Sequence, residues 1–584
     1  MEEYVWSLDV LYHDYDDPKF QQDVKDFGKK IKDLQAFADG MNHDNEEETI
    51  VQALKMLEAV TLLQYSFKYI AFRKSANTTD TETVTYMSRI MDMAAKMTKS
   101  IAIINRYIAS VEQLDVLIQN NEYLSQYAYL LHSTKKEANY LLSNEVEDVI
   151  SKMNLNAGAA WSNLREYLTS TMKVEYQGEL TNLSAIRNLA YDESPEIRKA
   201  AYEAELASYE QVKDSIAFAL NSIKGQVNML AEMRGYESVL DMTLHQARMK
   251  KETLEAMLTA MKEYFPKFRE YLKRKASLLG YTNGLPWFEL FASLGENQKK
   301  YSVEEAKEYL LTHFTPFASD MAEMMKTAFE DHWIDFFPRN GKVGGAFCSN
   351  LSNVKQSRVL TNYDGALGDI ITLAHELGHA YHGMMIEDHA PLNWDYSMPV
   401  AETASTFNEN IIMNAAIDAA SGEEKVALIE NQLQDLTQVM CDIYSRYLFE
   451  TDVFDRRKNE FLFPEELQNM MLKAQKEAYG DGIDPEYLHP FMWVNKSHYY
   501  SPDLSFYNFP YAFGALFARG LVVKYQEMKE DFVPNYRKML KATTVSDVED
   551  VAKLIGIDLT SVDFWRSSLD TAAKRIDEFL ELTK

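Results

Sequence analysis

Apolar residues recur at helical spacing through the first part of the chain. The clearest stripe advances in steps of three and four residues and comprises Phe20, Val24, Phe27, Ile31 and Leu34. This spacing places apolar side chains on one face of a helix, where they can pack against a core. Between Pro18 and Pro266 the only proline is Pro195, so little interrupts helices there. The pattern predicts a mostly α-helical protein.

Two stretches depart from the helical pattern. Residues 171–185 are typical of a short strand pair or loop, and a helix is expected to begin after them, with Ser194 as its cap. We therefore predict an N-terminal helical domain over residues 1–190 and a second domain over 191–584. Residues 343–363 hold two β-prone runs around a polar turn, which predicts a β-hairpin. Helices are expected directly after it, the first opening at Asp369 and the next ending at Gly422.

Composition and charge restrict the possible partners. The 584 residues carry a net charge of −29, which argues against nucleic acid or an anionic membrane, because phosphate contacts require clustered Lys and Arg. No apolar run approaches the roughly 18 residues of a membrane span, and the N-terminus is acidic where a secretory signal would be basic. Only Cys348 and Cys441 occur, which excludes a disulfide framework and favours a reducing compartment. We predict a cytoplasmic location, while the oligomeric state stays open.

One motif carries recognisable metal chemistry. Residues 375–379 read His-Glu-Leu-Gly-His, the pattern H-E-x-x-H, within the helix expected after the hairpin. Residues four apart share one face of a helix, so His375 and His379 can reach a single zinc ion while Glu376 faces its water. A catalytic zinc requires a third protein ligand and an open position. With only two cysteines available, that ligand must be another His or a carboxylate.

The third ligand is sought after the motif. His382 lies seven residues from His375 on the same helix, about 10 Å of rise, which is too far for one tetrahedral ion. Glu402 is the best candidate, because it lies early in the next helix and a helix-loop-helix return can bring it opposite the two histidines. Glu409 lies on the same side of that helix and is expected to accept the second N–H of a ligand histidine. Asp369 is expected to cap its helix.

The motif and its surroundings resemble a known family. LAHELGHAYH followed by VAETASTFNE, with 27 residues from His375 to Glu402, is similar to the oligoendopeptidase F branch of the thimet oligopeptidase family. The opening VWSLDVLY and the later FYNFPYAFGALF are similar to the same branch. The resemblance implies an elongated helical body with a deep channel, one Zn²⁺ held by residues matching His375, His379 and Glu402, and Glu376 as general base. Short unstructured peptides would be its substrates.

The resemblance also implies that a histidine and tyrosines bind the scissile carbonyl. The matching segment offers His498, Tyr507 and Tyr511, although Gly514 stands where another tyrosine of the thimet branch is expected. On the other side of the zinc, an exposed edge of the hairpin could pair with an extended peptide, and Gly344, Gly345 and Ala346 would let its backbone approach. The sequence thus predicts a zinc endopeptidase. A helical zinc carboxypeptidase and a non-catalytic scaffold of the same fold remain the alternatives.

Overall fold

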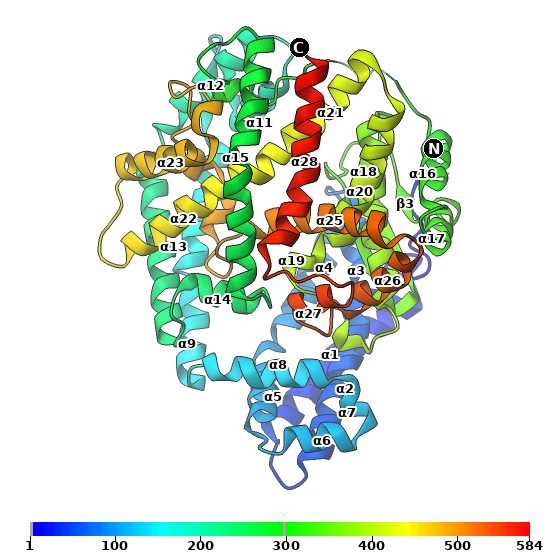
Figure 1. The fold of residues 1–584 in the computed structure, drawn as a ribbon. Coiled ribbons are helices and arrows are strands. Elements are labelled where there is room, and N and C mark those ends of the chain that lie inside the picture. The colour runs from blue at the N-terminus through cyan, green and yellow to red at the C-terminus, as the bar shows by residue number, and fades with distance from the viewer. Residues whose placement is uncertain (1–3, 296–298) are drawn as a thin grey trace. The chain divides into compact units, whose positions relative to one another are not determined.

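The computed structural model describes residues 4–295 and 299–584 and is built mostly of helices (Figure 1). It divides into two compact units, each made of three chain segments. The first unit comprises Met1–Leu141, Gln298–Ile412 and Lys529–Ile555, and the second comprises Leu142–Asn297, Met413–Met528 and Gly556–Lys584. The predicted mostly α-helical class is confirmed. Residue 190, the predicted domain boundary, lies within the second unit.

The first unit opens with a group of helices packed around the predicted apolar stripe. All five residues of that stripe are buried on α1, which packs against α2, α4 and α5. Asp17 caps α1 by accepting the N–H of Lys19, and Pro18 occupies the first helical position, where its missing N–H costs nothing. The helices of this unit are α1 (Pro18–Asp39), α2 (Glu46–Ser66), α3 (Lys68–Ala76), α4 (Thr81–Ala95), α5 (Thr98–Ser110), α6 (Leu114–Asn120), α7 (Glu122–Gln126), α8 (Ala128–Glu137), α16 (Val303–Phe314), α17 (Ser319–Glu330), α18 (Leu367–Ile386), α19 (Met398–Ala401), α20 (Thr403–Ala419, which runs on into the second unit), α26 (Phe532–Ala542) and α27 (Val548–Lys553).

A three-stranded sheet lies beside α18 in the first unit. Its strands are β3 (Ile334–Asp335), β4 (Phe347–Leu351) and β5 (Gln356–Leu360), in the order β3-β5-β4. β4 and β5 form the predicted antiparallel hairpin, and Lys355 takes a left-handed conformation (φ 51°) just before β5 begins. Both hairpin strands contact α18. Because β4 is an edge strand of this sheet, one side of its backbone has no paired strand among the described residues.

The second unit is a bundle in which α15 and α28 run side by side (Figure 1). The stretch 171–185 contains the short strand pair β1 (Lys173–Tyr176) and β2 (Glu179–Asn182). Ser194 caps α12 as predicted, accepting the N–H of Ile197 at 3.3 Å. The helices are α9 (Asn144–Asn154), α10 (Gly158–Thr171), α11 (Leu183–Asn188), α12 (Pro195–Tyr209), α13 (Lys213–Met233), α14 (Val239–Gln246), α15 (Lys251–Leu278), α21 (Gly422–Thr437), α22 (Ile443–Arg457), α23 (Pro464–Tyr479), α24 (Met492–Asn495), α25 (Phe509–Met528) and α28 (Val562–Leu582).

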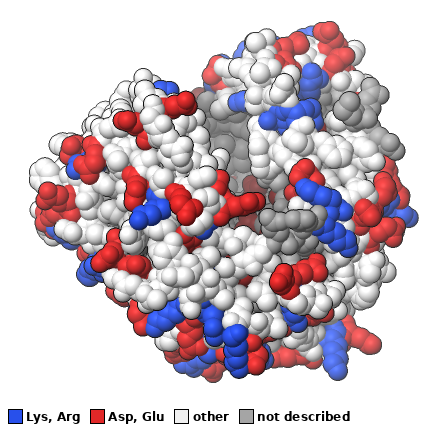
Figure 2. Space-filling model, turned by 90° about the horizontal axis from the view of Figure 1, so that it is seen from above, with Lys and Arg blue, Asp and Glu red and all other residues white. Residues whose placement is uncertain are grey.

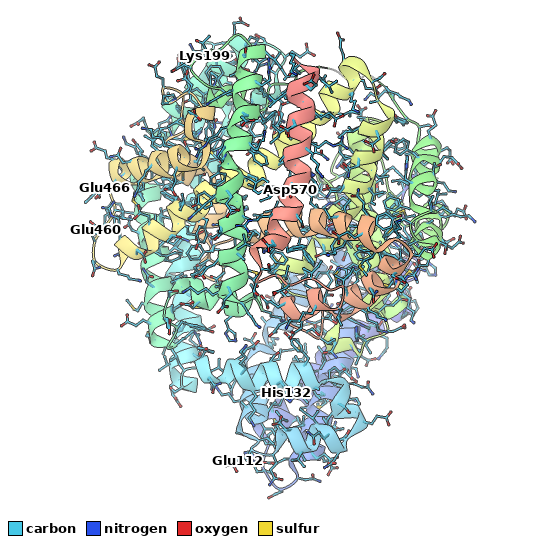
Figure 3. All side chains as sticks on the ribbon, viewed as in Figure 1. Glu112, His132, Lys199, Glu460, Glu466 and Asp570 are labelled. Carbon is cyan, nitrogen blue, oxygen red and sulfur yellow. The ribbon has the colours of Figure 1, made fainter. Side chains whose placement is uncertain are left out.

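Charged side chains are spread over the surface. Lys199 and Glu466 lie at the outer edge of the second unit (Figure 3), with 44% and 37% of their side chains exposed. On the face shown in Figure 2, acidic and basic side chains are intermixed, so the net charge of −29 is not gathered there into one patch. Across the described residues, no helix is both long and apolar enough to cross a membrane.

Candidate metal centre

Helix α18 fixes the two motif histidines. On its core side Ile370, Leu373 and Leu377 are fully buried, which anchors the helix. His375 and His379 lie one turn apart with 23% and 16% of their side chains exposed.

The start of α18 is capped as predicted. The Asp369 carboxylate accepts the N–H groups of Asp364 and Ala366 at 2.9 and 3.0 Å. Ala366 is the residue directly before α18, so this first-turn carboxylate accepts the N–H of the N-cap residue, as in one half of a capping box. Asp369 therefore caps α18 and takes no part in the group of metal-binding atoms.

Three donor atoms converge at the motif. His375 Nε2 lies 3.2 Å from His379 Nε2, and Glu402 Oε2 lies 3.3 and 3.2 Å from these two nitrogens. Ligands about 2.0–2.1 Å from a tetrahedral zinc ion would be separated by roughly 3.3–3.4 Å. The three atoms thus have the spacing that one zinc ion requires, and two nitrogens with one carboxylate oxygen are a donor set that zinc accepts. The Glu376 carboxylate also lies within 4.8 Å of both imidazoles.

Glu402 occupies a break between two helices. It follows α19 and precedes α20, with φ −91° and ψ 8°. The sequence predicts one continuous helix ending at Gly422, and this is wrong: α20 ends at Ala419, and Gly422 begins α21. At the break, Ser405 Oγ donates to Glu402 Oε2 at 2.9 Å and so orients the carboxylate.

The close approach of α20 to α18 depends on a glycine in the motif. A Cβ atom on Gly378 would lie 2.6 Å from both Ala404 O and Ser405 Cα, well inside van der Waals contact. Asn408 Nδ2 also donates to Ala374 O of α18 at 3.1 Å. The missing side chain at Gly378 thus lets the backbone next to Glu402 pack directly on the helix that carries the histidines.

Carboxylates next to His375 control its protonation. His375 Nδ1 lies 2.9 Å from Glu409 Oε1, within hydrogen-bonding distance. Burial opposes a charge on His375, but the hydrogen bonds to Glu402 and Glu409 outweigh it and raise the pKa of this histidine to about 10. Partial burial opposes a charge on Glu402, whose side chain is 43% exposed, yet its hydrogen bonds to His375 and His379 hold its pKa well below the usual range. Burial raises the pKa of Glu376, which is 6% exposed. Glu376 is therefore a stronger base than an ordinary glutamate.

His382 is separate from this group, as predicted. Its Nε2 lies 2.8 Å from Thr543 Oγ1, and its ring stacks on Tyr396 with 4.2 Å between centroids. The side chain is fully buried, and burial lowers its pKa to about 3. His382 is a neutral core histidine that supports the helix.

A cavity of about 370 Å³ opens over the donor atoms. Its lining comprises Ala346, Phe347, Cys348, Asn350, His375, Glu376, His379, Tyr396 and Glu402. Of the three small residues predicted to face a peptide, Ala346 lines the cavity, while Gly344 and Gly345 are exposed in the turn leading into β4. Sequence reasoning missed Tyr396 and Cys348, because neither belongs to a motif. Burial raises the pKa of Cys348, so this residue is a neutral thiol.

The remaining predicted residues form a group of their own in the second unit. The ring centroid of His498 lies 4.8 Å from that of Tyr507 and 5.8 Å from that of Tyr511, and the two tyrosine rings are 5.2 Å apart. Burial lowers the pKa of His498 to about 4, and the positive charges of Arg446 and Lys496 add to this effect. His498 is therefore neutral at pH 7.

Two buried charged residues hold the loops that carry this aromatic group. Before His498, Arg165 donates from Nε to Val494 O at 3.2 Å. On either side of Tyr507, the Glu450 carboxylate accepts hydrogen bonds from the N–H of Phe506 at 3.1 Å and from Asn508 Nδ2 at 2.8 Å, and Lys224 Nζ also donates to it at 2.6 Å. Phe506 has a left-handed backbone (φ 51°), which is costly for a bulky residue and persists only where its surroundings impose it. The sequence gives no signal for either contact, because the partners lie far apart along the chain.

Comparisons with known proteins identify the family of the chain. The model of peptidase family M3 matches residues 188–571, and that of oligopeptidase F matches residues 109–173. Oligopeptidase PepF of Bacillus subtilis is 26% identical over 81% of this chain and 72% of its own length. An oligoendopeptidase F homolog of Lactococcus lactis is 21% identical over 100% of this chain and 98% of its own.

Solved structures show the same fold. Oligoendopeptidase-F from Enterococcus faecium superposes with a TM-score of 0.72 at 20% identity, covering 97% of this chain and 98% of its own. The M3 family model alone spans well over half of the chain. The protein therefore belongs to peptidase family M3, in its oligoendopeptidase F branch, and is a metallo-oligopeptidase.

Proposed function

We propose that the protein is a zinc-dependent endopeptidase that hydrolyses short, unstructured oligopeptides. The observation that carries the proposal is the triangle of donor atoms from His375, His379 and Glu402, with sides of 3.2–3.3 Å, next to the buried Glu376. These three side chains would hold one Zn²⁺ and leave its fourth position open toward the cavity.

Individual side chains have separate roles in the proposed reaction. Zinc, when bound, polarises the peptide carbonyl and lowers the pKa of a bound water. Glu376 accepts the proton of the attacking water on its carboxylate and passes it to the nitrogen of the departing amine. Glu409 Oε1 lies 2.9 Å from His375 Nδ1, so this carboxylate can take the Nδ1–H when Nε2 binds metal. Ser405 keeps the Glu402 oxygen turned toward the histidines.

Substrate binding is assigned to the edge of β4. An extended peptide can add to an unpaired strand edge through main-chain hydrogen bonds, which tolerate many side chains. The turn before β4 contains Gly344 and Gly345, around whose Cβ positions there is open space, and Ala346 lines the cavity. Asn362 Nδ2 donates to Val343 O and Gly345 O at 3.0 and 2.8 Å, which holds this turn in place. Such recognition predicts broad sequence specificity.

Binding of the scissile carbonyl is assigned to His498, Tyr507 and Tyr511. This role rests on the family resemblance and on the clustering of the three rings. A neutral imidazole and phenol groups donate hydrogen bonds without bringing a full positive charge. Replacing one such donor typically lowers turnover by about 100- to 1,000-fold.

We also propose that the protein is located in the cytoplasm. This location is supported by the two free cysteines, Cys348 and Cys441, since a protein in an oxidising compartment tends to use its thiols in disulfides.

Mass spectrometry of a digested peptide mixture tests the proposal. We expect internal cleavage of short peptides, including peptides whose C-terminus is blocked as an amide, and loss of cleavage after chelation. Glu376→Gln should retain zinc and cleave nothing, His379→Ala should lose both properties, and Glu387→Gln, at the residue directly after the end of α18, should behave as the natural protein. Removal of single C-terminal residues only would favour the carboxypeptidase alternative. A natural protein without zinc, or an active Glu376→Gln variant, would refute the assignment.

A further inference from the structure

A second cavity, of about 160 Å³, lies inside the second unit and belongs to no part of the proposed reaction. It is enclosed by residues of α11 and α12, by the segment around Trp287 and by residues 489–496. Five of its lining residues are aromatic: Tyr191, Tyr202, Trp287, Phe288 and Phe291. Tyr191 is 64% exposed, so the cavity reaches the surface on that side. An apolar cavity of roughly 150 Å³ accommodates a benzene ring, so this one has room for a ring-sized ligand.

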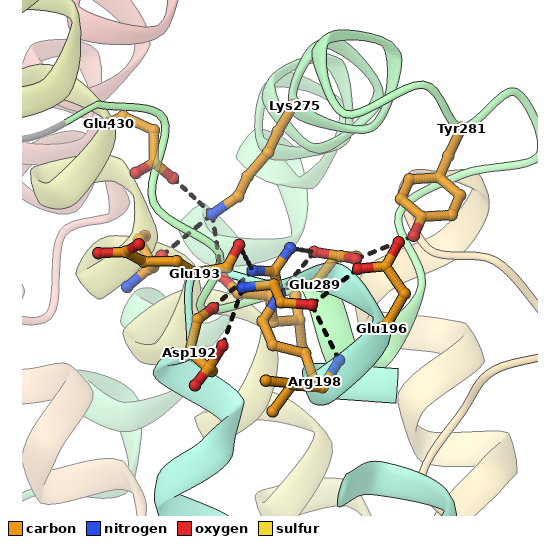
Figure 4. Close-up of polar contacts among 12 residues, drawn as sticks. Asp192, Glu193, Glu196, Arg198, Lys275, Tyr281, Glu289 and Glu430 are labelled. Carbon is orange, nitrogen blue, oxygen red and sulfur yellow. Dashed lines mark hydrogen bonds and ion pairs between the residues drawn. The ribbon is translucent and has the colours of Figure 1, made fainter. Parts of the chain in front are cut away.

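The charged residues in the lining leave one positive charge without a partner. Arg198 Nε donates to Glu289 Oε2 at 2.9 Å, a buried pair shown in Figure 4. Arg187 Nη1 lies 3.2 Å from Glu205 Oε1, so these two charges also offset each other. The remaining cation in the lining is Lys496.

The Lys496 ammonium group has no hydrogen-bond or ion-pair partner among the described residues. Four charged residues influence Lys496 from further away. Asp442 and Glu205 are negative and Arg446 and Arg187 are positive, so together they supply no net negative charge. Burial lowers the pKa of Lys496 to about 8. An ammonium group in such surroundings is stabilised by an anion that supplies the missing hydrogen-bond acceptors.

The same lining includes a buried histidine whose ring nitrogens make no hydrogen bond within the described residues. His489 lines the cavity and is 1% exposed, yet its Nδ1 has no hydrogen-bond partner in the described part of the chain. Its Nε2 is 3.4 Å from Glu205 Oε1, longer than a normal hydrogen bond. Gln475 bonds both the N–H and the C=O of His489, which fixes its backbone. Buried polar atoms in folded proteins are nearly always hydrogen-bonded, so a bound group is expected here.

We propose that this cavity binds a small, singly charged organic carboxylate, with its carboxyl group at Lys496 and His489 and its apolar body against the aromatic walls. One uncompensated positive charge matches one carboxylate. The ring-sized apolar volume favours an organic acid over an inorganic anion, which would leave the aromatic side of the cavity unfilled. Because Glu205 already offsets Arg187, a doubly charged ligand would lack a second cation.

Benzoate and benzamide are suitable probes, since they differ in charge and little in shape. In crystals soaked with 4-bromobenzoate, the anomalous signal of bromine should appear in the cavity, and 4-bromobenzamide should give none there. In calorimetric titrations, Lys496→Met should weaken benzoate binding by about tenfold or more. Lys473→Met, at an exposed lysine of α23, should leave it unchanged.

The comparison with the lysine variants separates this cavity from the metal centre, which can also attract carboxylates. Bromine at the metal centre alone, equal binding of benzoate and benzamide, or unchanged binding by Lys496→Met would overturn the proposal. The soaking experiment uses the natural protein, so it decides the matter even if the variant fails to fold. None of these experiments measures peptide cleavage. Their results therefore do not bear on the peptidase assignment.

Discussion

Replacing Gly378 by alanine should separate the two helices that build the metal centre. The new Cβ atom would lie 2.6 Å from Ala404 O and Ser405 Cα and 2.8 Å from Ser405 N. These are backbone atoms of the Glu402-Ser405 region, which cannot rotate out of the way as a side chain can. Ordinary contact begins at 3.4 Å, so α18 and α20 must part by about 0.8 Å.

That shift is large compared with the tolerance of a zinc site. If Glu402 retreats by the same amount, its carboxylate oxygen moves to about 4 Å from the imidazole nitrogens, whereas metal-ligand distances are held within about 0.2 Å. Overpacking of this kind costs about 1–3 kcal/mol of stability. Loss of a hydrogen-bond partner behind a metal ligand typically weakens metal affinity by roughly 10- to 100-fold. Displacing one of the three ligands themselves should weaken zinc affinity by more than that.

Zinc competition with a chromophoric chelator measures the affinity, and urea unfolding of the metal-free protein measures the stability separately. Gly368→Ala is the matched control, because it lies on the same helix with open space around its Cβ position. We expect this control to bind zinc and cleave peptides as the natural protein does. Natural zinc affinity in Gly378→Ala, with the spacing of α18 and α20 unchanged in its crystal structure, would refute the reasoning.

Three further predictions concern residues around the two groups of site residues. Glu409→Gln should weaken zinc affinity about 10- to 100-fold in the same competition assay, because the amide no longer accepts the His375 N–H as strongly; unchanged affinity would exclude this role. His498 has a folded pKa of about 4, below the ordinary value near 6.5, so stability should fall as pH drops from about 6.5 toward 4. His498→Gln should flatten this slope in urea unfolding at pH 7 and pH 5, and an identical slope would contradict the burial argument. Glu450→Gln leaves Lys224 buried without its counter-charge and should cost about 3–5 kcal/mol; a loss under about 1 kcal/mol would show that the pair is not required.

Much of the local structure follows from the sequence alone. The apolar stripe of α1, the caps at Asp369 and Ser194, and the hairpin of β4 and β5 all depend on residues close together along the chain, where backbone periodicity and turn chemistry decide the outcome. The pairing of His375 with His379 is of the same kind. A spacing of four residues puts both imidazoles on one face of a helix, whatever the rest of the fold.

Contacts between distant segments needed the tertiary structure. Glu402 could be ranked by its position in the sequence, but its distances to the two imidazoles depend on how α20 packs against α18 at Gly378. The break that ends α19 at Glu402 was likewise missed, because helical periodicity continues across it.

The sequence by itself determined the helical class, the motif and the chemistry that the motif permits. It could not determine the two discontinuous units, the hydrogen bond from Phe506 to Glu450, or the meeting of Lys496 and His489 in the lining of the second cavity. Each of these depends on side chains brought together from segments far apart along the chain. Such contacts depend on how whole helices pack together. They cannot be predicted from the residues that neighbour each other along the chain.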